Sequence, residues 1–147
     1  MSLRERLNDE LKTSMKSKDD LKLSVIRMVR SSVKNREIDQ QHELDDREII
    51  EIISTLCKQR RESIRLFREA KRQDLVDKEE KELALLQEFL PQQLTLEELE
   101  NLVRKTIVQC GAQGSKDMGR VMKALQPSVA GRADGKLVSD VVKEQLA

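Results

Sequence analysis

Residues 91–98 read PQQLTLEE, and this short stretch decides how the chain is organised. Proline lacks a backbone N–H and ends most helices that reach it, so Pro91 predicts a boundary. Thr95 and Glu98 have the spacing of a capping box, in which each side chain bonds the amide of the other residue and a helix begins. The stretch therefore divides the chain into two helical domains.

The N-terminal domain, residues 1–91, is predicted to be a four-helix bundle. Its apolar side chains recur every three or four residues, which is the period of one helix face. Arg60 falls inside the apolar stripe of the third helix, so we expect it to pair with a carboxylate or to reach solvent. Helix starts are predicted where Ser or Asp precedes an apolar stripe: at Ser2, at Asp19 or Asp20, at Asp45 or Asp46, and near Asp74.

The C-terminal domain, residues 95–147, is predicted to be a smaller three-helix bundle. Its first helix turns Leu96, Leu99, Val103 and Ile107 inward, and Gly111 is placed to end that helix in the left-handed conformation. No window of the chain alternates with the period of a strand, so the fold class is all-α. The other helix limits are predicted at a serine cap, a closing proline and a final cap: Ser115, Pro127 and Asp134.

Gly119 lies within the second helix of this domain. Glycine inside a helix costs about 1 kcal/mol relative to alanine, so we expect something to approach the backbone there. A neighbouring helix of the same domain and an external ligand both explain such an approach.

The composition limits the classes of function. Charged residues make up 37% of the chain and hydrophobic residues another 37%, with two Phe and neither Tyr nor Trp. Proteins that read single-stranded bases usually stack them on aromatic side chains, which argues against that mode here. The net charge of +1 excludes a uniformly basic nucleic-acid binder but allows a locally basic one.

The cysteines and the apolar runs of the chain bear on the location of the protein. Cys57 and Cys110 lie far apart without a CxxC spacing, which suits reduced thiols. The first residues, MSLRERLNDELK, alternate charge with leucine, unlike a signal peptide, and no apolar run approaches the length of a membrane span. These features predict a cytoplasmic protein that does not enter a membrane.

Three patterns resemble catalytic or metal-binding motifs, but each is explained better without such a function. GRADGK, residues 131–136, lacks the P-loop spacing and the hydroxyl residue after its lysine. His42 is the only histidine, and one histidine in a polar turn does not specify a metal site. The carboxylates of DKEEKE, residues 77–82, suit a solvated helix face, and no serine has a convincing base. We therefore expect no catalytic residue, no cofactor and no metal.

Cationic side chains form two rows in the N-terminal domain and a group in the C-terminal domain. The two rows suit solvent-facing helix surfaces or partners for the acidic fourth helix. The C-terminal group suits either a phosphate-binding rim or solubilising side chains beside a tight turn. The rows are Arg27, Arg30 and Lys34, and Arg61, Arg65, Arg68 and Arg72; the group is Lys116, Arg120, Lys123, Arg132 and Lys136.

Two stretches of this domain, KDMGRVMKAL (residues 116–125) and GRADGKLVSDVVKEQL (residues 131–146), strongly resemble the YqeY family. They also look like the C-terminal tail of GatB, the tRNA-binding subunit of the glutamine-dependent aminoacyl-tRNA amidotransferase. N-terminal stretches match YqeY as well: SLRERLNDELKTSMKSKD, LSVIRMVRSSVKNREID, KQRRESI and EFLPQQL. The resemblance to YqeY covers essentially the whole chain, and that to GatB only about its last third.

This resemblance implies an all-α protein whose tail recognises the elbow region of tRNA, and a family link to carbon–nitrogen ligase activity with glutamine as amide donor. The Ser/Ser/Lys machinery, the ATP site and the zinc-type ligands of the amidotransferase subunits have no counterpart here. We therefore expect no catalysis by the chain alone. The implied candidate RNA contacts are Lys116, Gly119, Arg120, Lys123, Arg132 and Lys136.

Three hypotheses follow. The first is a tRNA-binding or amidotransferase-associated module, whose partner is tRNA or an amidotransferase. The second is a helical adaptor for another protein partner, with no role for RNA, which the segregated basic and acidic blocks support. The third is an amidotransferase in its own right. The resemblance places the first ahead of the others.

Overall fold

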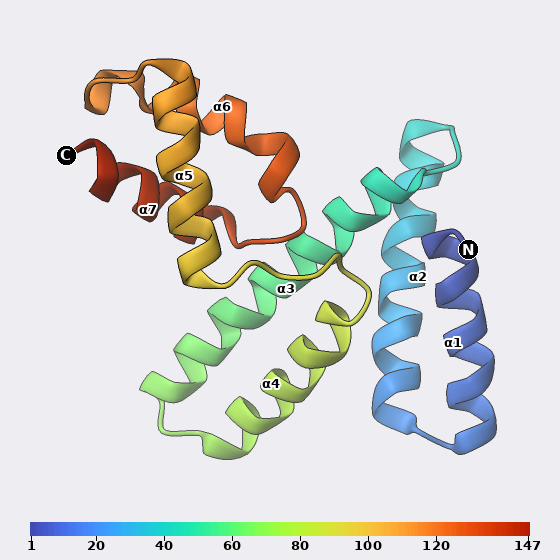
Figure 1. The fold of residues 1–147 in the computed structure, drawn as a ribbon. Helices are drawn as coiled ribbons and strands as arrows, with labels where there is room; N and C mark the ends of the chain where they lie inside the picture. The colour runs from blue at the N-terminus through green and yellow to red at the C-terminus, as the bar shows by residue number, and fades with distance from the viewer. The chain divides into compact units, whose positions relative to one another are not determined.

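The computed structural model describes all 147 residues and contains helices and no strand, which confirms the all-α prediction (Figure 1). The chain divides into two compact units, Met1–Leu90 and Pro91–Ala147. The elements in chain order are α1 (Leu3–Ser17), α2 (Asp20–Gln40), α3 (Asp46–Glu69), α4 (Gln73–Gln87), α5 (Leu96–Cys110), the 3-10 turn η1 (Ser115–Asp117), α6 (Met118–Val129) and α7 (Gly135–Leu146).

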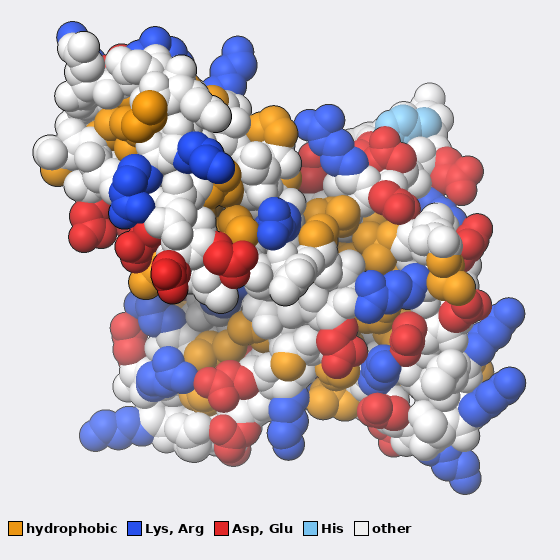
Figure 2. All heavy atoms as spheres, in the orientation of Figure 1, with side chains coloured by type: hydrophobic (Ala, Val, Ile, Leu, Met, Phe, Trp, Pro, Cys, Tyr) orange, Lys and Arg blue, Asp and Glu red, His pale blue; other side chains and the backbone are white.

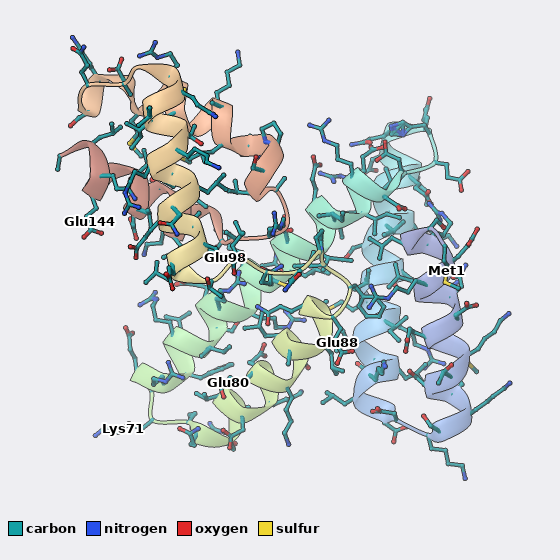
Figure 3. All side chains as sticks on the ribbon, in the orientation of Figure 1. Met1, Lys71, Glu80, Glu88, Glu98 and Glu144 are labelled. Carbon is teal, nitrogen blue, oxygen red and sulfur yellow. The ribbon has the colours of Figure 1, made fainter.

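The starts of α1 and α5 are fixed by the two capping boxes that the sequence predicts. The Oγ atom of Ser2 accepts a hydrogen bond from the backbone N–H of Glu5 at 3.1 Å. In the same way, Oγ1 of Thr95 accepts from the backbone N–H of Glu98, a first-turn residue of α5, at 3.1 Å (Figure 3). Helix α5 ends at Gly111, whose φ of 64° is left-handed as expected.

The N-terminal unit makes the equivalent turns without glycine. Lys18, Gln41 and Lys71 follow the ends of α1, α2 and α3 with φ angles of 57°, 58° and 58°. A residue with a Cβ pays on the order of 1 kcal/mol for this left-handed conformation. Packing of the helices on either side therefore holds these turns against their local preference.

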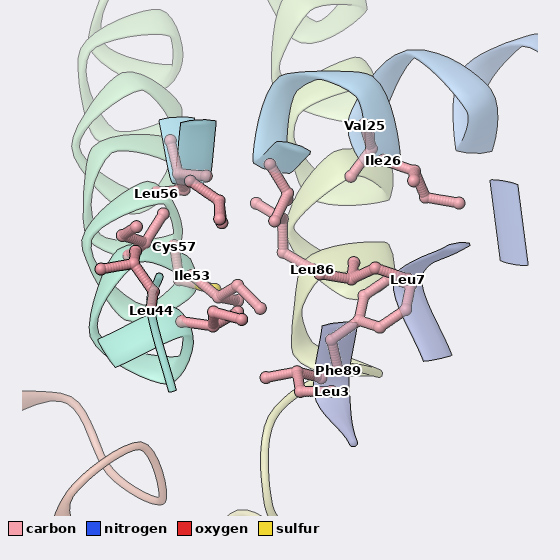
Figure 4. Close-up of a cluster of buried hydrophobic side chains, with 14 residues drawn as sticks. Leu3, Leu7, Val25, Ile26, Leu44, Ile53, Leu56, Cys57, Leu86 and Phe89 are labelled. Carbon is pink, nitrogen blue, oxygen red and sulfur yellow. The ribbon is translucent and has the colours of Figure 1, made fainter. Parts of the chain in front are cut away.

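The core of this unit is aliphatic and draws on all four of its helices (Figure 4). Ile26, Ile53 and Leu86 are fully buried and come from α2, α3 and α4. Phe89 is also buried, just beyond the end of α4, and the guanidinium of Arg6 lies 5.1 Å from its ring centre. This phenylalanine is thus a packing residue, not a platform for a base.

Cys57 lies within the same core and is a structural residue. Burial raises the pKa of its thiol, and the guanidinium groups of Arg61 and Arg60 oppose that rise only in part. Since the thiolate is the reactive form of cysteine, this thiol is held in its inert form.

Arg60 meets the expectation that a cation in the apolar stripe needs a carboxylate. Its Nε donates to Glu82 Oε2 at 2.8 Å and lies 3.3 Å from Glu79 Oε2. All three side chains are mostly buried between α3 and α4, and Met28 of α2 also contacts the guanidinium. The arginine therefore joins two helices through one charged cluster.

The second cationic row is used for ion pairs within the unit. Arg65 pairs with Glu62 and Glu69, Arg68 pairs with Glu80 of α4 at 3.0 Å, and Arg72 pairs with Asp74 at 3.1 Å. On the visible face of α3 and α4, basic and acidic side chains are accordingly interspersed (Figure 2).

Glu37 of α2 provides a test of stability against pH. Its carboxylate accepts from the backbone N–H of Leu44 at 2.9 Å and from the guanidinium of Arg4. The Leu44 amide, followed by Arg4, holds the pKa of Glu37 below its ordinary value of 4.5.

A depressed pKa in the folded state contributes stability above the unfolded pKa, and that contribution is lost as pH falls through the folded value. We expect Glu37→Gln to lower stability at neutral pH and to reduce the further loss of stability below pH 4.5. Urea unfolding at several pH values, followed by circular dichroism, measures this. Equal acid sensitivity in the variant and the wild type would contradict it.

The C-terminal unit has its own core. Leu99 and Val103 of α5 pack with aliphatic residues of α6 and α7, among them the buried Leu125. Leu96, predicted to face inward, is instead 53% exposed, and Leu137 of α7 is 40% exposed. Both lie in the first turn of their helix, so the apolar spacing extends beyond the part of each helix that packs against the core.

Helix α6 differs from its predicted limits at both ends. Ser115 begins a 3-10 turn instead of capping the helix, and the N-cap of α6 is Asp117. Pro127 lies inside the last turn, and the helix continues to Val129. The proline has no N–H to donate to the carbonyl of Lys123, one turn earlier, and both residues are exposed.

Candidate nucleic-acid interface

The outward face of α6 carries the central candidate residues. Helix α6 buries Val121 and Leu125, four residues apart, against the core of the unit. Gly119, Arg120 and Lys123 fall on the opposite side of the helix, at 100° per residue, and all three are exposed. Packing of the apolar side therefore directs these residues toward solvent.

Lys116, in the 3-10 turn just before the helix, extends this set. It is exposed and precedes Arg120 by four residues. We call Lys116, Gly119, Arg120 and Lys123 the α6 face.

Asp117 is the residue of this region that the sequence interpretation missed. Its Oδ2 accepts from the backbone N–H of Gln113 at 2.9 Å, and its Oδ1 lies 3.2 Å from the guanidinium of Arg120. The Gln113 amide, with Arg120 and Lys116 beyond it, lowers the pKa of this carboxyl group. The ionised aspartate fixes the turn and leaves the α6 face with a net charge of +2, from three cations and one anion.

The surroundings of Gly119 exclude a neighbouring helix as the reason for a glycine at this position. It lies in the first turn of α6, is exposed, and a Cβ built on it would meet nothing within 4 Å. No neighbouring helix approaches its backbone. The open space leaves room for a ligand from outside the unit.

Arg132 has a structural function that its charge did not indicate. Its Nε donates to the carbonyl of Gln92 at 3.0 Å, and its own carbonyl accepts from the N–H of Leu94 at 2.8 Å. Beside it, Nε2 of Gln93 donates to the carbonyl of Gly131 at 2.7 Å. These bonds fasten the α6–α7 turn to the segment before α5. These hydrogen bonds join residues about forty positions apart in the sequence, so no local sequence pattern predicts them.

Lys136 is exposed in the first turn of α7. That turn follows the far end of α6, and a helix of twelve residues is about 18 Å long. The six candidates therefore lie on two segments of the unit: the α6 face, and the pair Arg132 and Lys136 at the turn into α7. Asp134 is the N-cap residue of α7, and its side chain makes no capping hydrogen bond there.

The remaining polar motifs form no comparable group. His42 Nε2 lies 3.4 Å from Glu48 Oε2 in a surface turn. No three His, Cys, Asp or Glu side chains are arranged to hold a metal ion. None of the helices combines the length and the apolar character that crossing a bilayer requires.

Comparison with known proteins identifies relatives over most of the chain. The family model for Yqey-like protein matches residues 4–146. The chain is 32% identical over 142 residues to "Altered inheritance of mitochondria protein 41, mitochondrial" of Pyrenophora tritici-repentis, covering 95% of this chain and 78% of the relative. It is 40% identical over 87 residues to the protein of the same name from Lachancea thermotolerans, covering 58% and 46%.

A third relative of that name, from Vanderwaltozyma polyspora, is 42% identical over 85 residues, covering 57% of this chain and 46% of the relative. The chain spans about half the length of most of these curated relatives.

The names of these relatives overturn the prediction of a cytoplasmic protein, because they are mitochondrial proteins. The prediction rested on reduced cysteines and the absence of long apolar runs. Those features also suit a reducing compartment inside an organelle, so they do not identify a location. The family itself is shown by the match over nearly the entire sequence: the chain belongs to the Yqey-like protein family.

Proposed function

We propose that the chain is a tRNA-binding module associated with an amidotransferase, and that it contacts the RNA phosphate backbone through the α6 face. The observation that carries this proposal is the α6 face itself. Gly119, Arg120 and Lys123 are exposed on the side of α6 opposite to its buried residues, and Lys116 is exposed in the turn just before the helix.

The chemistry of this face suits phosphate oxygens. Lysine and arginine bind phosphate as charge-assisted donors, and arginine adds a planar pair of N–H groups. Gly119 lets a backbone come closer than any side chain would allow. Recognition of folded RNA by shape and phosphate also agrees with the lack of aromatic platforms, since Phe89 is buried.

The link to amidation of aminoacyl-tRNA rests on the resemblance of residues 116–146 to the GatB tail. In that setting the chain would hold tRNA while a separate enzyme carries out amide transfer. Lys136 is a secondary contact in this proposal. Arg132 contributes by fixing the turn between the two helices.

The binding test compares two matched triple variants with the wild type. The first, Lys116→Gln, Arg120→Gln and Lys123→Gln, removes the cations of the α6 face. The control, Arg104→Gln, Lys105→Gln and Lys143→Gln, removes the same charge from exposed positions of α5 and α7. Arg132 is left unchanged because its loss would disturb the fold.

Affinity for folded tRNA is measured at several salt concentrations. We expect the first variant to bind on the order of a hundredfold more weakly at about 0.1 M salt, with a salt slope smaller by about three. The control should stay close to the wild type. The Asp117→Asn variant should change the affinity in the opposite direction and bind tRNA more tightly, because the substitution removes the anion beside the α6 face.

Equal weakening in both triple variants would mean a non-specific charge effect and would contradict the assignment of the α6 face. A wild type that does not bind tRNA even at low salt would remove RNA from the function and leave the helical adaptor. The proposed association with an amidotransferase is tested by adding the chain to a glutamine-dependent amidotransferase with aminoacylated tRNA. An unchanged amide yield would contradict this association.

A further inference from the structure

Helix α2 carries a second set of cations that the unit does not use. Arg27, Arg30 and Lys34 are exposed, and none of them makes an ion pair or a side-chain hydrogen bond. From Leu21 to Arg36 the helix contains no acidic residue. We call Arg27, Arg30 and Lys34 the α2 face.

The neighbouring cations of the same unit behave differently. Lys22 and Arg36, also on α2, pair with Glu10 at 2.7 Å and Glu51 at 3.5 Å. The second row, on α3 and the turn after it, is paired as well, since Arg65, Arg68 and Arg72 each have a carboxylate partner. The α2 face is therefore a local excess of positive charge, although the chain as a whole is nearly neutral.

The geometry of the α2 face matches a regular row of anions. Residues 27, 30 and 34 recur at i, i+3 and i+7, which places them on one side of the helix. They span seven residues, or about 10 Å along the axis. One strand of a nucleic-acid duplex presents a phosphate about every 3.4 Å of its axis, so about three phosphates fall within the same length.

We infer that the α2 face binds the phosphate backbone of a structured RNA, as a contact separate from the α6 face. This inference rests on the proposed function. An RNA suits the face better than an acidic protein, because centres of protein interfaces are poor in charge and rich in aromatic anchors. The α2 face has no aromatic residue, and the one large exposed apolar side chain of α2 is Ile38, 64% exposed, beyond Lys34.

The test uses the full chain with Arg27→Gln, Arg30→Gln and Lys34→Gln. The matched control is Arg65→Gln, Arg68→Gln and Arg72→Gln, which removes the same charge from equally exposed positions of the same unit. Circular dichroism confirms that both variants remain folded. The probe is folded bulk tRNA, with polyglutamate as a competitor of similar charge.

We expect the α2 variant to bind at least tenfold more weakly and to lose two to three from the salt slope, at about 0.9 per phosphate contact, while the control changes little. Polyglutamate should compete poorly. An unchanged slope in the α2 variant, or polyglutamate competing as well as tRNA, would overturn the inference.

Comparison with the α6 variant separates this inference from the proposed function. If only the α6 variant loses affinity for tRNA, the inferred α2 contact is contradicted and the proposed function stands. If only the α2 variant loses affinity for tRNA, the proposed α6 site is contradicted and the inferred α2 contact stands. A wild type that does not bind tRNA overturns both.

Discussion

Replacing Arg60 with methionine is expected to lower the free energy of unfolding by about 3 kcal/mol. Methionine fills a similar volume but leaves Glu79 and Glu82 facing each other without a cation, mostly buried between α3 and α4. Removing one member of a buried charge cluster costs more than the cluster contributes, because the remaining charges stay desolvated. Urea unfolding followed by circular dichroism measures the loss.

The control restores neutrality. Adding Glu79→Gln and Glu82→Gln to Arg60→Met should recover most of the lost stability, since no uncompensated charge remains. A triple variant as unstable as Arg60→Met alone would show that the guanidinium acts by packing, through contacts such as that with Met28, and not by charge.

Leu125→Ala is expected to cost about 3 kcal/mol and to unfold the C-terminal unit selectively. Leu125 is buried at the centre of a small core that belongs to α5, α6 and α7 alone. A unit of this size has little stability to lose, so one cavity is enough to open it. The N-terminal unit keeps its separate core.

Hydrogen exchange read by mass spectrometry tests this selectivity. Amides of α5, α6 and α7 should lose protection in the Leu125→Ala variant while those of α1 to α4 keep theirs. Leu137→Ala, at a 40% exposed position of the same unit, is the matched control and should change little. Loss of protection throughout the chain would mean that the two units unfold together.

The sequence predicts most of this fold because its helix signals are local. The capping boxes at Ser2 and Thr95 define where α1 and α5 begin, and a single charged residue in an apolar stripe was enough to anticipate the pairing of Arg60. In each case the interaction joins nearby residues or follows from the cost of burying an unpaired charge.

The remaining features depend on tertiary packing. Lys18, Gln41 and Lys71 adopt left-handed turns against their own preference, which no sequence rule for glycine or proline reveals. Pro127 lies inside α6, which continues to Val129, although proline usually ends a helix. The continuation of the helix past this proline is a property of the folded unit, not of the local sequence.

The candidate site divides in the same way. Helical spacing from the apolar positions Val121 and Leu125 is enough to set Arg120 and Lys123 on the outward side of α6. It did not reveal that Asp117 pairs with Arg120, or that Arg132 is bonded to Gln92 across a long stretch of chain. Charge alone selects residues that are able to bind phosphate, but only the folded structure shows which of them are already engaged.

The residue found at the position of Gly119 in related chains would indicate whether selection acts there on something other than stability. Because a methyl group there would touch nothing in the unit, folding by itself favours alanine, by up to about 1 kcal/mol. Related chains that evolve for stability alone should therefore exchange this glycine freely. Its retention across divergent relatives would register a constraint imposed from outside the protein, whereas frequent alanine would mark a helix start that nothing approaches.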